Sequence, residues 1–338
     1  MAAAVVRVAV DAMGGDRAPE APVHGVLAAL ELAEDLEVVL VGPSHVLKPL
    51  LADHGDPRLS FVDATELVGE EAHPALRVRQ RTDASVVRTV RLLAEGRADA
   101  AVSVGNTGAV LAAAVIELGL LPGLRRPVVA GRLPVAPRTL LADLGANADV
   151  SARHFVDFAH LAVTWHQVVF GDELPTVALL ANGREPGKGT PRIREAAERL
   201  RLESVDFRGF AEPQDLLAGR FDVVLVDGYV GNLVLKTVEA LSGWYAERLA
   251  RVAVSAADER LQALRSEAEE LSDLTRSAPS ITVLGVNGTV VPGHGRASAA
   301  DITRLVLRAK QAVEHDDAGR LRHAWLGRRD APRAFTAR

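Results

Sequence analysis

Short β-branched apolar runs alternate along most of the chain with alanine- and leucine-rich segments of helical periodicity, and this alternation strongly limits the possible folds. It favours an α/β fold in which a mainly parallel sheet carries helices on both faces. We expect strands at residues 5–10, 37–41, 59–62, 98–104, 128–130, 139–143, 176–181, 205–208, 222–227 and 281–286, and helices at residues 21–33, 44–52, 85–94, 106–118, 151–169, 191–201 and 297–312. A single domain over residues 1–338 is the expected organisation.

Residues 230–276 interrupt this alternation. Val230, Val234, Val238 and Leu241 recur at spacings of three and four, which is typical of one helical face. A second run of leucines between residues 261 and 274 lies among many charged residues. The pattern predicts a projecting helical hairpin inserted in the domain, with dimer contact as its expected use and cover for the sheet edge as the alternative.

Composition excludes several classes of protein. The chain has no cysteine, which excludes disulfides, thiolate metal sites and a cysteine acyl-enzyme. A net charge of −5 argues against a dedicated nucleic-acid binder. The first ten residues lack the pattern of a signal peptide, and the apolar stretch at 100–116 is interrupted by polar residues. We therefore expect a soluble, cytoplasmic protein.

Four polar, glycine-containing turns each follow one of the apolar runs. They are Asp11-Ala-Met-Gly-Gly-Asp16, Gly105-Asn-Thr-Gly108, Asp143-Leu-Gly-Ala-Asn147 and Asp227-Gly-Tyr-Val-Gly-Asn232. The carboxyl ends of parallel strands lie side by side at the edge where open α/β sheets bind ligands. Backbone N–H groups in such turns favour a small anion.

The loop Asn182-Gly-Arg-Glu-Pro-Gly-Lys-Gly-Thr190 resembles a P-loop only superficially. Three residues separate Gly183 from Gly187, and Gly189 occupies the position of the magnesium-binding hydroxyl residue. ATP binding is therefore not expected, although the loop could hold a phosphate with Lys188 as its cation.

Other familiar motifs are missing from the sequence. It contains no Gly-x-Gly-x-x-Gly and no Gly-x-Ser-x-Gly, and the histidines lack metal-ligand spacing. We therefore expect no cofactor and no metal. His294 is flanked by glycines after a strand, where it could act as a cation or a donor. Basic residues around Arg79 and Arg81 form either a solvated face or a docking surface for an acidic partner.

Together these motifs resemble the PlsX family of phosphate acyltransferases. The resemblance rests on residues 8–16, 105–109, 143–147, 188–189, 227–237 and 294–295, in this order over nearly the whole chain. It implies a Rossmann-like fold related to phosphotransacetylases and to isocitrate- and isopropylmalate-type dehydrogenases. It also implies conversion of acyl-[acyl carrier protein] and inorganic phosphate to acyl phosphate. The implied partners are a second copy of the chain, the carrier protein, a downstream acyl-phosphate:glycerol-3-phosphate acyltransferase of phospholipid synthesis and, weakly, the membrane surface.

The resemblance and the turns together suggest how the site is built. Because phosphate is itself a nucleophile, the expected mechanism is direct attack on the thioester, with orientation as the main contribution. We expect Lys188, His294, Asn232 and Asp227 to be catalytic, with Asp11 or Asp16 orienting Lys188 or His294. Phosphate and substrate binding is expected at Asp11, Gly14, Gly15, Asp16, Gly105, Asn106, Thr107, Gly108, Asp143, Gly145, Asn147, Gly183, Gly189, Gly228, Gly231, Lys236 and Gly295.

The sequence departs from the family pattern at four places. These are Ala181, residues 82–86, residues 277–280 and residues 296–297. They leave two alternatives open: a phosphotransacetylase-like enzyme that uses acyl-CoA, and a diverged, non-catalytic module that binds the acylated carrier protein.

Overall fold

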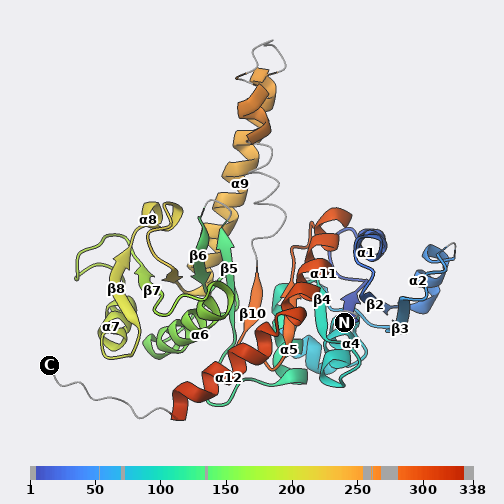
Figure 1. Ribbon diagram of the computed structural model, residues 1–338, viewed down its shortest axis with the longest axis horizontal. Coiled ribbons are helices and arrows are strands. Elements are labelled where there is room, and N and C mark those ends of the chain that lie inside the picture. Colours follow the sequence, from blue (N-terminus) through green and yellow to red (C-terminus); the bar gives the residue numbers. More distant parts are fainter. Residues whose placement is uncertain are drawn as a thin grey trace.

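The computed structural model describes residues 5–52, 54–69, 73–133, 136–253, 260, 262–267 and 281–330. Its strands form two sheets, which lie in two lobes on either side of a long projecting helix (Figure 1). The expected α/β class with mainly parallel strands is confirmed, although the strands are divided between two sheets. The extent of the domain stays a prediction.

The first sheet is entirely parallel. Its order is β11 (Thr289–Pro292), β4 (Ala100–Ser103), β1 (Val6–Asp11), β2 (Leu36–Gly42) and β3 (Leu59–Asp63). Side chains alternate between its two faces. Val8 and Val10 pack among residues of α1 (Glu20–Leu32) and α11 (Ala299–Glu314), whereas Ala9 packs on the other side with Leu92 of α4 (Ser85–Ala94).

The second sheet is mixed. Its order is β10 (Thr282–Leu284), β5 (Val128–Leu133), β6 (Ala136–Ala142), β9 (Val223–Leu225), β7 (Thr176–Leu180) and β8 (Asp206–Ala211). β5 is antiparallel to both β10 and β6, and the other pairs are parallel. One face is covered by α6 (Ala152–Phe170) and α7 (Pro191–Leu200), with Phe155 and Phe158 fully buried.

Helix α5 (Thr107–Leu118) joins the two sheets into one hydrophobic core. Its buried Val110 and Ala114 belong to a cluster that also contains Val290 of β11 and Val129 of β5. The start of α5 therefore has a fixed position between the lobes, which matters for the site described below.

Several elements were not expected from the sequence. Strand β11 and the helices α3 (Pro74–Gln80), α8 (Pro213–Leu217) and α12 (Asp317–Asp330) were missed. α3 and α12 are rich in arginine, and β11 has only four residues, so none of them shows a clear apolar periodicity. The remaining helix, α2 (Ser44–Leu50), begins at the expected residue and ends two residues before the expected end.

The first arm of the predicted hairpin is α9 (Gly228–Ala253), which projects from the body of the molecule (Figure 1). Of the second arm, residues 260 and 262–267 are helical. Residues 254–259, 261 and 268–280 lie outside the described residues, as does the departure at 277–280. None of the described helices is both long enough and apolar enough to cross a bilayer.

Candidate active site

A cavity of about 470 Å³ lies where the carboxyl ends of β1, β4 and β11 meet the first turns of α9. Three neighbouring strands of the parallel sheet supply its loops, as expected for an open α/β sheet. Of the residues expected to bind substrate, the cavity is lined by Asp11, Gly14, Gly15, Asp16, Gly105, Asn106, Thr107, Gly108, Asn232, Lys236, His294 and Gly295.

The loops after β1 and β4 approach each other too closely for a side chain at Gly14. A Cβ atom there would lie 2.7 Å from the backbone nitrogen of Gly105 and 3.0 Å from Oδ2 of Asp11. The next residue, Gly15, has φ +89°, and its neighbour Asp16 donates its N–H to the carbonyl of Gly295 at 2.7 Å. Glycine at position 14 thus joins two loops and draws the third loop to the same rim.

Helix α5 begins at this rim. Oδ1 of Asn106 accepts the N–H of Ala109 at 3.1 Å. The Asn106 side chain is therefore the N-cap of α5. The N–H groups of Thr107 and Gly108 belong to the first turn and have no acceptor within the helix. Because both residues line the cavity, the positive end of the helix dipole faces it.

Asp11 is buried beneath the cavity and organises the loops. Its Oδ2 accepts the hydroxyl of Ser103 at 2.7 Å and its Oδ1 the N–H of Met13 at 3.1 Å. Burial raises the pKa of Asp11, and hydrogen bonds from Ser85, Ser103, Met13 and Gly14 only partly oppose this. Among the described residues, its side-chain partners are serines rather than Lys188 or His294, so the expected orienting role is not what the geometry shows.

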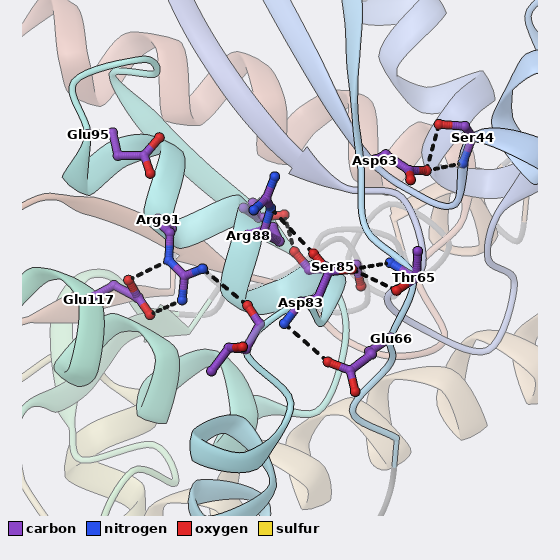
Figure 2. A network of polar contacts seen from close by, with 12 residues as sticks. Ser44, Asp63, Thr65, Glu66, Asp83, Ser85, Arg88, Arg91, Glu95 and Glu117 are labelled. Atoms are coloured by element: carbon purple, nitrogen blue, oxygen red, sulfur yellow. Dashed lines mark hydrogen bonds and ion pairs between the residues drawn. The ribbon is translucent and has the colours of Figure 1, made fainter.

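A polar network fixes the segment that departs from the family pattern, residues 82–86 (Figure 2). Asp83 accepts the N–H and hydroxyl of Thr65 at 2.9 and 2.7 Å, and its own N–H donates to Glu66 at 3.2 Å. Arg91 pairs with Glu117 at 2.8 Å and donates to the carbonyl of Thr82 at 3.2 Å. The network places Ser85 in the wall of the cavity beside Asp11.

Lys236 and His294 meet at the mouth of the cavity with a third residue, Glu239. The Nζ atom of Lys236 lies 3.1 Å from Nδ1 of His294 and 2.9 Å from Oε2 of Glu239. Nε2 of His294 lies 2.9 Å from Oε1 of Glu239. Since an ammonium can only donate, Nδ1 accepts and the ring proton is assigned to Nε2.

The charge of this trio favours the ionised carboxylate. Burial would raise the pKa of Glu239, but the hydrogen bonds and charges of His294 and Lys236 outweigh burial and leave the pKa below its usual value. Glu239 holds the Lys236 ammonium and the His294 imidazole at the cavity, three residues along α9 from Lys236. Lys236 lines the cavity, where its ammonium can bind an anion and stabilise developing negative charge.

The turn 143–147 supports the site from below. Asp143 is fully buried, and its carboxylate accepts N–H groups of Val129, Gly145, Ala146 and Asn147 and the amide of Asn147. Burial raises the pKa of Asp143 to about 6, although these hydrogen bonds act in the opposite direction. The turn's Leu144 lines the cavity, whereas Asp143, Gly145 and Asn147 are not among the lining residues.

Helix α9 begins against this turn. A Cβ atom at Gly228 would lie 2.8 Å from the backbone nitrogen of Asn147, and one at Gly231 would collide with the carbonyl of Asp143. Asp227 accepts the N–H of Val230 at 2.9 Å, as an N-terminal cap does. The two glycines and Asp227 thus set the helix position, and Asn232 and Lys236 reach the cavity from it.

The loop 182–190 lies apart from the cavity. It follows β7 of the second sheet, and Lys188, Gly183 and Gly189 are not among the residues that line the cavity. Lys188 is exposed, and its stem lies over Gly183, where a Cβ atom would be 2.8 Å from Cγ of Lys188. Asn182 accepts the N–H of Gly189 at 3.0 Å within the same loop. Lys236, rather than Lys188, is the lysine beside His294.

The basic residues expected to dock a carrier protein lie near the cavity. Exposed Arg79 is on α3, whose first residue Pro74 packs against Gly108 of α5. Arg81 donates to the carbonyl of Leu67, a residue that lines the cavity. Both arginines therefore lie on segments that contact residues of the cavity lining.

One group of potential metal ligands occurs among the described residues, away from the cavity. His166, Asp172 and Asp222 place one ligand atom each within 4.8 Å of one another. Each is also held by the protein: His166 by the carbonyl of Arg138, Asp172 by the Arg138 side chain and Asp222 by Thr176. The group lies near the amino ends of β7 and β9 in the second sheet, and none of its residues lines the cavity.

Three site residues were missed from the sequence: Glu239, Ser85 and Ser103. Glu239 had a detectable signal, since it lies one helical turn after Lys236 and therefore on the same face. The serines gave none, because their role depends on the loops of β1 and β4 meeting in space.

Comparison with known proteins identifies the family. The model of the family described as "Fatty acid synthesis protein" matches residues 6–320. The chain is 37% identical over 333 residues to a phosphate acyltransferase of Salinibacter ruber, covering 95% of this chain and 98% of that protein. It is 38% identical over 323 residues to a phosphate acyltransferase of Anaeromyxobacter sp. (strain K), covering 93% and 88%.

Solved structures show the same fold at low sequence identity. A phosphotransacetylase from Streptococcus pyogenes has a TM-score of 0.55 at 20% identity, and the EutD phosphotransacetylase from Staphylococcus aureus has 0.54 at 14%. Both alignments cover 91% of this chain and 94% of the other. By family model, sequence identity and fold, the chain belongs to the phosphate acyltransferase (PlsX) family of acyltransferase enzymes.

Proposed function

We propose that the enzyme transfers the acyl group of an acyl-[acyl carrier protein] to inorganic phosphate, giving acyl phosphate and free carrier protein. The observation that carries this proposal is the convergence of the α5 N-terminus and Lys236 on one cavity of about 470 Å³. The helix N-terminus provides N–H donors at the positive end of its dipole, and Lys236 provides an ammonium.

In this reaction an oxygen of hydrogen phosphate attacks the thioester carbonyl carbon and forms a tetrahedral intermediate. The intermediate collapses with cleavage of the carbon–sulfur bond, and the proton of the phosphate leaves with the thiol. Holding the nucleophile beside the carbonyl can contribute roughly 7–11 kcal/mol. The first-turn N–H groups of α5 hold the phosphate, and Lys236, fixed by His294 and Glu239, stabilises the oxyanion.

The direct test compares two thioesters with and without phosphate. Purified enzyme is incubated with acyl carrier protein thioester or acyl-CoA, and acyl phosphate is measured by mass spectrometry. The proposal expects phosphate-dependent product, formed faster from the carrier protein thioester. Faster product from acyl-CoA would favour the phosphotransacetylase-like alternative, which the fold of the solved relatives supports. Absence of acyl phosphate with both donors would refute the proposal.

The product is a mixed anhydride, so a second enzyme must consume it. We propose that this second enzyme is an acyl-phosphate:glycerol-3-phosphate acyltransferase, which would direct the acyl group into phosphatidic acid, and that the present enzyme acts in the cytoplasm. A coupled reaction with glycerol 3-phosphate and such an enzyme should yield lysophosphatidate only when phosphate and the present enzyme are both included.

We also propose that α9 mediates homodimer formation. Its outer part exposes large apolar side chains, including Leu241, Trp244 and Tyr245, which are 59%, 58% and 51% exposed. Such exposure on one helix marks an interaction surface. Light scattering should give a dimer for the parent and a monomer for Leu241→Ser with Trp244→Ser. Co-flotation of the parent with anionic vesicles, lost in that double variant, would indicate membrane contact at the same surface instead.

A further inference from the structure

A second and larger cavity, of about 640 Å³, lies outside the site described above. It is bounded by the final turns of α6 and α11, the start of α12 and the strands β10 and β11. Its lining does not include Lys236, His294 or the glycine turns. A cavity of this volume is within the usual range for small-molecule sites.

One wall of this cavity is cationic. Arg132, Arg308, Arg320 and His315 line it, together with a single carboxylate, Asp317. Burial lowers the pKa of Arg308 to about 10, and the charge of Arg132 acts in the same direction. Two positive charges therefore line the same cavity, and an anion bound beside Arg308 would offset the cost of burying that charge.

Arg308 has no protein counterion in contact. In the described part of the chain, none of the hydrogen bonds or ion pairs involves its guanidinium, and Asp317 acts on it only through its charge. Burial raises the pKa of Asp317 despite the charges of His315, Arg320 and Arg308. Asp317 is thus the one carboxylate in the lining, and no hydrogen bond or ion pair joins it to Arg308 among the described residues.

Another part of the lining is apolar. Trp165, Val168, Val169 and Phe170 of α6 line it, with Leu284 and Val286 from the β10 segment. Phe170 also carries the Arg132 guanidinium over its ring at 5.5 Å, so the two walls meet at this residue. A ligand that fits both walls must carry an anionic group and an apolar part.

We propose that this cavity is a second ligand site, which binds a single-chain anionic amphiphile with its phosphate or carboxylate group at Arg308 and its chain along Trp165–Phe170. The ligand's anionic group pairs with Arg308, and the charge of Arg132 in the same lining favours a dianionic phosphate monoester over a carboxylate. The proposal does not depend on which acyl donor the enzyme uses.

The test is a titration with dodecyl phosphate and, in a second arm, with dodecanoate. Binding is followed by calorimetry and by the change in intrinsic tryptophan fluorescence that a Trp165→Phe variant should lose. The parent should bind one equivalent at the Arg308 site in addition to any binding at the active site. Arg308→Gln should lower the affinity of the additional site at least 30-fold, and Arg308→Lys should lower it less.

Arg304→Gln is the matched control, because Arg304 lies on the exposed side of the same helix and pairs with Asp301. Lys236→Met should remove only active-site binding.

Unchanged affinity and stoichiometry in Arg308→Gln would overturn the proposal. Equal affinity of the site for orthophosphate and dodecyl phosphate would also overturn it, because the apolar wall would then have no role. Stability gives a further check: without ligand, Arg308→Met should melt no lower than the parent, since it removes an unpaired charge. A lower melting temperature would show that the protein itself satisfies Arg308. These readouts measure binding and stability, so failure of the acyl-transfer proposal would leave them interpretable.

Discussion

The Nζ atom of Lys236 lies 3.1 Å from Nδ1 of His294, although one residue is on α9 and the other follows β11. The contact links the helix that leaves the second sheet to a loop of the first sheet. The contact between Lys236 and His294 therefore depends on the position of the two sheets relative to each other. Glu239 contacts both and makes the arrangement a closed trio.

Replacing Lys236 should abolish most activity. Lys236→Met removes the cation beside the cavity, and we expect kcat/KM for phosphate to fall roughly 100-fold or more, as for loss of one oxyanion donor. Lys188→Met is the matched control and should stay within about twofold of the parent, because Lys188 is outside the cavity lining. Steady-state assays at varied phosphate decide between them. A larger loss of activity in Lys188→Met than in Lys236→Met would instead support Lys188 as the catalytic lysine, as the sequence predicts.

Glu239→Gln should reduce activity by a smaller factor and alter the pH dependence of stability. The pKa of Glu239 is lowered in the folded protein from 4.5, so its stabilising contribution is complete above that value and disappears as pH falls through the folded pKa. The difference in melting temperature between parent and variant should therefore be constant near neutral pH and shrink below about pH 4.5. A difference independent of pH would show that Glu239 acts only by packing.

Asp143→Asn should destabilise the protein although it removes a buried charge. The amide cannot accept all the N–H groups that converge on this carboxylate, so at least one buried donor loses its partner at a cost of about 1–3 kcal/mol. The pKa of Asp143 is raised in the folded protein, whereas that of Glu239 is lowered, so the two groups change stability with pH in opposite directions. The stability of the parent should decrease as pH rises from 3.8 to about 6, and the variant should lack this pH dependence. Urea unfolding at several pH values measures both effects.

Gly14→Ala should disrupt the rim while leaving most of the fold intact. The new methyl group would lie 2.7 Å from the nitrogen of Gly105, so the loops of β1 and β4 must separate. We expect loss of activity of at least tenfold. Gly187→Ala is the control, since a Cβ there meets nothing within 4 Å. An active Gly14→Ala enzyme would contradict the assignment of this rim to substrate binding.

Charge reversal at Arg79 should weaken carrier-protein recognition selectively. Arg79→Glu is expected to raise KM for the carrier thioester about tenfold, with a reduced salt dependence, while a small-molecule thioester is unaffected. Arg322→Glu, an exposed arginine on α12, serves as the control. Equal effects on both thioesters would place Arg79 in general substrate binding instead.

The sequence predicted the described strands other than β11, and most helices, because their apolar periodicity is local. It also placed the glycine turns at strand ends, and the turns after β1 and β4 do line one cavity. It could not assign roles within them. Asp143 and Asp227 look like ligand-binding acids in the sequence, yet one organises its own turn and the other caps α9.

The choice between Lys188 and Lys236 could not be made from the sequence either. Both lysines lie near glycine-containing motifs. Lys188 follows β7, which belongs to the second sheet, and the sequence does not show which strands share a sheet. The cavity at Arg308 had no sequence signal, because its lining comes from six separate elements, with Arg132 from β5 among them.

Helix α9 has a consequence that links assembly to catalysis. Its 26 residues form a rod about 39 Å long, with Lys236 near one end and exposed aromatic side chains toward the other. If a contact at the outer end tilts this helix, the ammonium at the inner end moves with it. The reaction rate is therefore expected to depend on what the enzyme is bound to, even when its substrates are saturating.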